Sequence, residues 1–155
     1  MKPKGIEEVL ASCEFFKGLS AGEIRKIGGI CEGRSCKAGS PLFQQGDFGE
    51  HLYIIAEGLV HLERSMKIGN RKGNIVIETL GKGRVLGCWS TLLNEPHIVM
   101  STAICQKATT VLVLQGARLR ELMTDNSTLG FNVLERLCFL LRDRIQAAYG
   151  ALDKI

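Results

Sequence analysis

The stretch with the composition of a small-molecule site runs from Gly81 to Ala103 and reads GKGRVLGCWSTLLNEPHIVMSTA. It has three glycines in its first seven residues, then a segment long enough for one or two helical turns, then Ser101 and Thr102. Glycine lets the backbone approach a ligand closely, and the first amides of a helix have no partner inside the helix. This combination can bind an anion, although most glycine turns are only turns.

The cysteines are the second group with potential chemistry, and they lie at positions 13, 31, 36, 88, 105 and 138. No CxxC motif occurs, so reduced thiols acting as small buried hydrophobes are expected. Cys31 and Cys36 form the only close pair, which is weak support for a metal site. Cys88 follows a glycine turn and precedes a short helix, where its thiol pKa could be lowered. It is therefore either a redox- or metal-sensitive thiolate or a buried neutral thiol.

Composition limits the classes of protein that remain. The chain has 155 residues, 45% of them hydrophobic, which is enough for one domain with a core. The net charge of +4 is scattered and does not indicate nucleic-acid binding. No apolar run approaches the roughly 18 residues of a membrane helix, and an acidic N-terminus does not suit a signal peptide, so we expect a cytoplasmic protein without membrane contact. No catalytic motif is present, so we do not expect an enzyme.

Periodicity predicts helices at the N-terminus and short strands after them. Residues 6–16 have the spacing of a helix, and Ser20 with Glu23 forms a capping box for a second helix ending between 28 and 33. Strands are predicted at 51–55, 59–63, 75–80 and 108–114, with 67–74 as a polar hairpin loop and 117–123 as a short helix. Short strands separated by glycine turns favour a closed or double-sheet β roll.

A long helix is predicted from residue 128 to 154. Its apolar residues step alternately by three and four, a heptad seam made of Phe131, Leu134, Cys138, Leu141, Ile145, Ala148 and Leu152. A second stripe consists of Val133, Leu137, Leu140 and Ala147. One stripe can face the β roll, and the other needs a partner. A second copy of the same helix is the simplest partner, which predicts a homodimer; the alternative is a helix buried within one subunit.

Four motifs occur in the order and with the residue types of one known family: Phe15-Phe16-Lys17-Gly18-Leu19-Ser20 with Glu23, Leu42-Phe43 before Gly46-Asp47, Leu52-Tyr53-Ile54-Ile55 with Gly58 and Val60, and Val111-Leu112-Val113-Leu114. They resemble the cyclic-nucleotide-binding domain of the catabolite-activator/fumarate-nitrate regulator superfamily. The resemblance implies a mainly β, α+β fold: a jelly-roll-like β roll with short N-terminal helices and a long C-terminal dimerisation helix. We expect N-terminal helices in 1–33, the roll in 34–116 and the C-terminal helices in 117–155.

In the resembling family, the segment that matches 81–103 is the phosphate-binding cassette. Its usual pattern is Gly-Glu, small and apolar residues, then Arg, Ser or Thr, and Ala. The Glu accepts a hydrogen bond from the ribose 2′-OH and the Arg pairs with the cyclic phosphate. Here Cys88 stands where Glu is expected, Val99 falls at the Arg position, and no Arg lies between Arg84 and Arg118. Because a buried phosphate needs a charged partner, the departure argues against binding cAMP or cGMP in the usual way.

Two other residues bear on the ligand. The same gapless comparison places Arg144 where the family's long helix reaches the ligand. Arg144 is either an exposed side chain on the helix surface or an arginine that contacts a ligand from its own or the partner subunit. Trp89 either fills the pocket or stacks on an aromatic ligand. The expected ligand-binding residues are Gly87, Cys88, Trp89, Ser90, Val99, Met100, Ser101, Thr102 and Arg144.

These observations predict a ligand-responsive, dimeric sensor domain of a signalling or transcription regulator, with an unidentified small-molecule effector. One alternative is a redox, haem or metal sensor acting through Cys88, since gas-sensing relatives bind haem near this segment. Another is a ligand-free dimerisation or docking module. Regulators of the resembling family read DNA through a helix-turn-helix that follows the long helix, and no such motif occurs in these 155 residues. A stand-alone sensor and the sensor part of a longer regulator both remain open.

Overall fold

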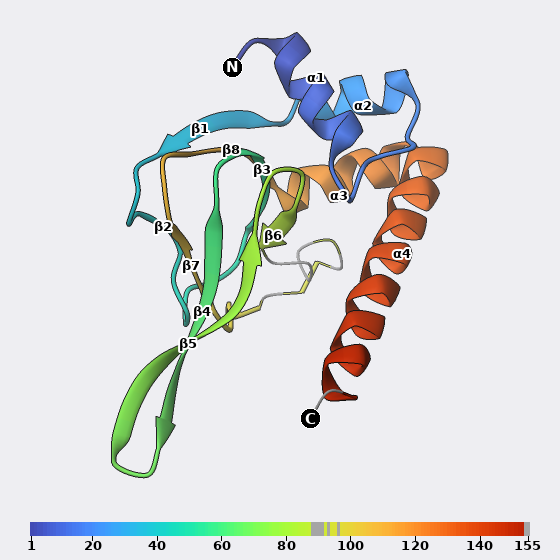
Figure 1. Ribbon diagram of the computed structural model, residues 1–155. Helices are drawn as coiled ribbons and strands as arrows, with labels where there is room; N and C mark the ends of the chain where they lie inside the picture. The colour runs from blue at the N-terminus through green and yellow to red at the C-terminus, as the bar shows by residue number, and fades with distance from the viewer. Residues whose placement is uncertain (88–91, 93, 96, 154–155) are drawn as a thin grey trace.

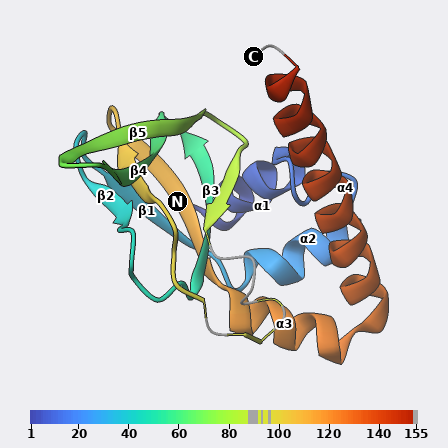
Figure 2. The same cartoon turned by 90° about the horizontal axis from the view of Figure 1, so that it is seen from below.

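The computed structural model describes residues 1–87, 92, 94–95 and 97–153. Two four-stranded antiparallel sheets form a β roll, with strand orders β1-β8-β3-β6 and β2-β7-β4-β5. The strands are β1 (Glu32–Cys36), β2 (Pro41–Phe43), β3 (His51–Glu57), β4 (Val60–Ile68), β5 (Arg71–Leu80), β6 (Val85–Gly87), β7 (Thr102–Cys105) and β8 (Thr109–Gln115). The helices α1 (Pro3–Ser12), α2 (Ala21–Gly28), α3 (Gly116–Asp125) and α4 (Ser127–Leu152) lie together on one side of the roll (Figures 1 and 2). This architecture confirms the predicted fold class.

The central strands β3 and β8 are buried on both faces. Side chains alternate across a strand, so Leu52 and Ile54 point to the helices while Tyr53 and Ile55 point into the roll. In β8 the alternation continues, with Leu112 and Leu114 on the helix side and Val111 and Val113 on the roll side. Continuous apolar runs are what a strand covered on both faces requires. The helices are therefore half of the core and not an appendage to the roll.

The N-terminal segment departs from the prediction. Helix α1 ends at Ser12, and Cys13 is already extended, whereas a helix through residue 16 was expected. Phe15 and Phe16 are both fully buried, with ring centroids 4.4 Å apart. Neighbouring residues on a helix point about 100° apart, so a surface helix cannot bury both rings, and the chain leaves the helix first.

The capping box that begins α2 is confirmed. The Glu23 amide donates to Ser20 Oγ over 3.2 Å, and the Ser20 amide donates to Glu23 Oε1 over 3.0 Å. The second carboxylate oxygen of Glu23 accepts a hydrogen bond from Asn132 Nδ2 on α4 at 3.0 Å. The cap therefore also connects α2 to the long helix.

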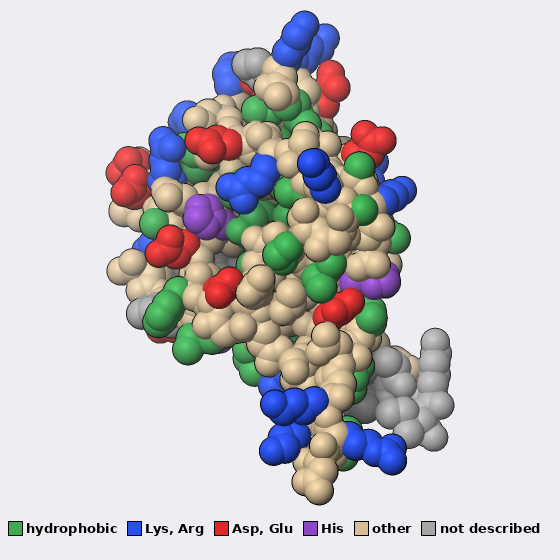
Figure 3. Space-filling model, turned by 90° about the vertical axis from the view of Figure 1, so that its left-hand side faces the viewer, with side chains coloured by type: hydrophobic (Ala, Val, Ile, Leu, Met, Phe, Trp, Pro, Cys, Tyr) green, Lys and Arg blue, Asp and Glu red, His purple; other side chains and the backbone are tan. Residues whose placement is uncertain are grey.

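The β4–β5 hairpin corrects a second expectation. Residues 67–74 were predicted as a loop, but β4 runs to Ile68 and β5 begins at Arg71, leaving a two-residue turn at Gly69-Asn70. The hairpin projects from the roll and ends in a cluster of Lys and Arg side chains (Figure 3). Both faces are in solvent there, so polar residues are tolerated and the usual apolar signal of a strand is missing. The short strands β1, β2, β6 and β7 were not predicted for a related reason, because they have only three to five residues.

Helix α4 places its two apolar stripes on different sides. Val133, Leu137 and Leu140 are buried against the helix-side core. The seam residues Phe131, Leu134, Cys138, Leu141 and Ile145 are exposed, while the Ala148 side chain lies outside the described set. Three residues of the second stripe therefore cover the roll, its fourth residue Ala147 is exposed, and the heptad seam faces outward. Among the described residues, no helix has the length and hydropathy needed to cross a bilayer.

Strand β6 ends in a glycine that the backbone requires. Gly87 pairs with Leu52 of β3 and has φ +127°, a conformation that side-chain-bearing residues rarely adopt. A Cβ on Gly87 would collide with the carbonyl oxygen of His51 and lie 3.1 Å from the Cα of Leu52. The two strands therefore approach closely only because this position carries no side chain.

We expect Leu137→Ala to lower the free energy of unfolding by about 2–5 kcal/mol, because it leaves a cavity in the helix-side core. Leu134→Ala removes the same atoms from a side chain that is 41% exposed, so it should lower the free energy of unfolding clearly less. The comparison is made at low protein concentration, so that pairing of α4 with a second copy does not bury Leu134. Urea unfolding of both variants measures the difference. Equal losses would contradict the burial of Leu137 in the core and the exposure of Leu134.

Gly87→Ala should lower the free energy of unfolding by about 1–3 kcal/mol or more, because alanine is strained at positive φ and its Cβ meets the β3 backbone. Gly81→Ala is the matched control, since a Cβ there has no neighbour within 4 Å and its φ is not positive. Thermal denaturation compares the pair. A Gly87→Ala protein as stable as Gly81→Ala would contradict the close approach of β3 and β6.

Candidate functional site

A cavity of about 210 Å³ lies between the roll and α4. It is bounded by the end of β6, the segment before β7, and side chains from β2, β4 and α4. The described lining residues are Phe43, Leu62, Val85, Leu86, Gly87, His97, Val99, Met100, Ser101 and Arg144. The walls are mostly apolar, with His97, Ser101 and Arg144 as polar side chains, which is the usual character of a small-ligand site.

Five of the residues expected to bind a ligand line this cavity: Gly87, Val99, Met100, Ser101 and Arg144. Thr102 does not share it. Its Oγ1 accepts the Gln45 amide at 2.9 Å, and it lines a separate open hollow with Gln45 and Ser65. Cys88, Trp89 and Ser90 lie outside the described residues, so their expected part in the site stays a prediction.

Val99 is positioned by backbone pairing with the loop after β2. The Val99 amide donates to the Asp47 carbonyl at 2.8 Å, and the Gly46 amide donates to the Val99 carbonyl at 2.9 Å. The Gly49 amide donates to the His97 carbonyl, also at 2.9 Å. These bonds hold the segment that carries Met100 and Ser101 beside the cavity. A valine at the position where the resembling family has an arginine is thus 7% exposed and contributes only apolar surface.

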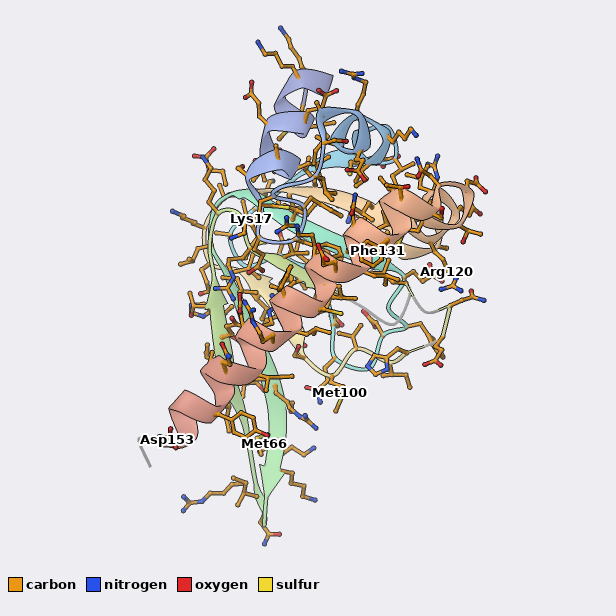
Figure 4. All side chains as sticks on the ribbon, turned by 90° about the vertical axis from the view of Figure 1, so that its right-hand side faces the viewer. Lys17, Met66, Met100, Arg120, Phe131 and Asp153 are labelled. Atoms are coloured by element: carbon orange, nitrogen blue, oxygen red, sulfur yellow. The ribbon has the colours of Figure 1, made fainter. Side chains whose placement is uncertain are left out.

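Arg144 reaches the cavity from the middle of α4 and is not an exposed surface side chain. Its side chain is 28% exposed. Nη2 donates to the Val85 carbonyl at 2.7 Å and to Glu14 Oε1 at 3.0 Å. Figure 4 views this side of the molecule, with Phe131 near the start of the helix, Asp153 just after its end and Met100 on the neighbouring loop. The arginine is therefore fixed at the edge of β6, beside the predicted ligand segment.

Glu14 is the centre of a group of charges at this edge, and the sequence analysis did not identify it. Besides Arg144, its Oε1 accepts the Val85 amide at 2.8 Å, and its Oε2 lies 3.1 Å from Arg84 Nε. Its own amide donates to the Gly83 carbonyl at 2.9 Å. Arg84 also pairs with Glu78 of β5. One carboxylate thus links the segment after α1, the turn before β6, and α4.

Other lining residues were also missed as site residues. Phe43 belongs to the Leu42-Phe43 motif and Leu62 to the predicted strand 59–63, and neither these two nor His97 were expected to bind a ligand. A second hollow of about 120 Å³ shares Phe43, Gly87 and Val99 with the cavity. Alternation along β2 and β4 could have pointed Phe43 and Leu62 inward, but nothing in the sequence indicates which inward positions meet a ligand.

The buried cysteines do not supply reactive thiolates. Burial raises the pKa of the Cys13 thiol to about 11 and that of Cys31 to about 12, so both are protonated at neutral pH. Within the described part of the chain, no group of three His, Cys, Asp or Glu side chains is arranged to hold a metal ion. The redox or haem alternative therefore depends on Cys88, which lies outside the described residues.

The chain is similar in sequence to known regulatory proteins. Over 161 positions the chain is 25% identical to the cyclic AMP receptor protein of Thermus thermophilus, covering 90% of this chain and 73% of that protein. It is 30% identical over 119 residues to the cGMP-dependent protein kinase of Toxoplasma gondii, which is 77% of this chain and only 11% of the kinase.

A solved structure has the same fold. The crystal structure of a cyclic nucleotide-binding domain from Methylobacillus flagellatus KT superposes with a TM-score of 0.81 at 25% identity, covering 99% of this chain and 84% of that one. The profile of the family described as "Cyclic nucleotide-binding domain" matches residues 33–126, more than half of the chain. The chain therefore belongs to the cyclic nucleotide-binding domain family of regulatory domains.

Proposed function

We propose that the chain is a ligand-responsive regulatory domain that binds a small anionic ligand, of which a cyclic nucleotide is the first candidate, in the cavity at Gly87. The observation that carries this proposal is Arg144, a half-buried cation on the wall of a cavity whose other described walls are mainly apolar. The relatives support the ligand class, since one is named a cyclic AMP receptor protein and another a cGMP-dependent protein kinase.

The charge of the ligand is the reason Arg144 matters. A cyclic phosphate carries one negative charge, and moving it from water into a cavity is costly without a charged partner. The cassette segment departs from the family pattern at Cys88 and Val99, so it offers neutral donors such as Ser101. An arginine can supply a charge-assisted hydrogen bond in their place. In this proposal the phosphate is held from the long helix and not from the cassette.

The proposed active form is a homodimer through α4. The seam residues are apolar, regularly spaced and exposed in the single chain; Phe131 is 65% exposed and Ile145 55%. Exposed apolar residues at heptad spacing are typical of a helix that pairs with another helix. Ligand binding at Arg144 would then shift the population between two arrangements of the paired helices.

The proposed role is regulatory and not catalytic. The chain matches only 11% of the kinase, so the kinase's own activity is no ground for assigning catalysis here. Control of transcription would act through DNA contacts made elsewhere than in the described elements. The division into units at residues 33 and 116 also stays a prediction.

Removing the charge of Arg144 tests the ligand site. We expect Arg144→Gln to weaken binding of cAMP or cGMP by about tenfold or more, the size of a lost charge-assisted hydrogen bond. Arg142→Gln is the control, because this substitution changes the net charge by the same amount. Arg142 is 57% exposed and pairs with Asp143. Isothermal titration calorimetry compares the two variants with the parent protein. Failure of the parent protein to bind either nucleotide, or equal effects of the two substitutions, would contradict the proposed site.

A charge in the seam tests the dimer. Ile145→Glu should convert a dimer to a monomer, because pairing two helices would bury the added carboxylates against each other. Gln146→Glu adds the same charge one residue along the helix, outside the seam, and should leave the mass unchanged. Sedimentation velocity measures the mass of each. A monomeric parent protein, or a dimer that survives Ile145→Glu, would show that α4 has no such partner.

A further inference from the structure

Arg144 separates two hollows. On one side it lines the cavity with Gly87 and Ser101. On the other it lines an open groove of about 710 Å³ between α4, the segment after α1 and β5, together with Glu14, Arg84 and Asp143. Its guanidinium donates to Glu14, which lines the groove, and to the backbone carbonyl of Val85, a residue that lines the cavity. A ligand in the cavity would therefore meet a cation that already has a counter-ion.

We infer that Glu14 sets the affinity of the cavity for anionic ligands by competing with the ligand for Arg144; this rests on the function proposed above. Glu14 acts from outside the cavity, so it is a residue that tunes affinity and not one that contacts the ligand. Its effect is predicted to depend on charge: it weakens the binding of an anion and has little effect on an uncharged ligand of similar shape.

The competition follows from burial and geometry. The Arg144 and Glu14 side chains are only 28% and 20% exposed, so their attraction is less screened by water than that of a surface ion pair. Both N–H groups of Nη2 already donate, one to Glu14 Oε1 and one to the Val85 carbonyl, so a phosphate must displace one of these contacts or meet the other N–H groups of the guanidinium. The ligand must therefore either displace the contact between Arg144 and Glu14, or bind to Arg144 while the negative charge of Glu14 stays close to it.

Glu14 can lose Arg144 without being left unsatisfied. Its carboxylate keeps the Val85 amide at 2.8 Å and Arg84 at 3.1 Å. Loss of a partner is expensive mainly when a buried charge is left alone, and two partners remain here. The exchange of Arg144 from carboxylate to ligand is therefore a small rearrangement. Since Glu14 belongs to the segment after α1 and Arg144 to α4, the exchange also loosens one tie between that segment and the long helix.

Neutralising Glu14 without changing its shape is the direct test. We expect Glu14→Gln to bind cAMP and cGMP about three- to tenfold more tightly than the parent protein, with adenosine binding unchanged. Glu78→Gln is the matched control, because it removes the same charge from the same group of ion pairs but contacts Arg84 and not Arg144. The double variant Glu14→Gln/Arg144→Gln should bind no more tightly than Arg144→Gln alone, which would show that the effect of Glu14 acts through Arg144. Titration calorimetry measures the parent protein, the three single variants and the double variant.

The outcomes separate this inference from the proposed function. Nucleotide binding by the parent protein with no gain, or a loss, in Glu14→Gln would overturn the inference and leave the ligand site standing. A gain of equal size in Glu78→Gln would also overturn the inference, since loss of any nearby negative charge would then have the same effect as loss of Glu14. Absence of nucleotide binding in the parent and in Glu14→Gln would overturn both. Should Glu14→Gln fail to fold, Glu14→Asp keeps the charge, shortens the reach to Arg144, and should give an intermediate gain.

Discussion

The fold depends on the burial of β3 and β8 on both faces. A strand with apolar side chains on both sides must be covered twice, and here the second sheet covers one face and the helices cover the other. This double cover brings α4 against the outside of the roll, with Val133, Leu137 and Leu140 in the core. It also brings Arg144, one turn beyond the last of these residues, to the edge of β6. The cavity lies beside β6, where the Arg144 side chain reaches the strand.

The elements that dominate this core were the predictable ones. The runs that became β3 and β8, the capping box at Ser20 and the two stripes of α4 all have strong local signals, and the structure has them close to the predicted bounds. The failures occurred where local signals are weak. Residues 67–68 and 71–74 belong to strands outside the core, where polar side chains cost little. Helix α1 stops early because Phe15 and Phe16 must both be buried.

The site likewise contains residues that the sequence predicted and residues that it did not. Gly87, Val99, Met100, Ser101 and Arg144 were expected together from a resemblance and do line one cavity, while Thr102 is held elsewhere by Gln45. Glu14 was missed because its partner on α4 is 130 residues away in sequence. Nothing in the local pattern of residues 13–16 indicates that a carboxylate there will meet two arginines. A contact of this kind exists only after the helices have packed on the sheet.

Because Arg144 lies on α4, the proposed ligand site is directly connected to the helix that is proposed to form the dimer. In the pattern of the resembling family the charge partner of the phosphate belongs to the cassette and not to the long helix. With Arg144 as that partner, the ligand would act on α4 directly. Arg144 and the seam residue Ile145 are neighbours in sequence and point about 100° apart around the helix. Any rotation of α4 that improves the contact of Arg144 with an anion must therefore also turn the exposed seam. In this arrangement the occupancy of the cavity and the geometry of a paired helix cannot vary independently.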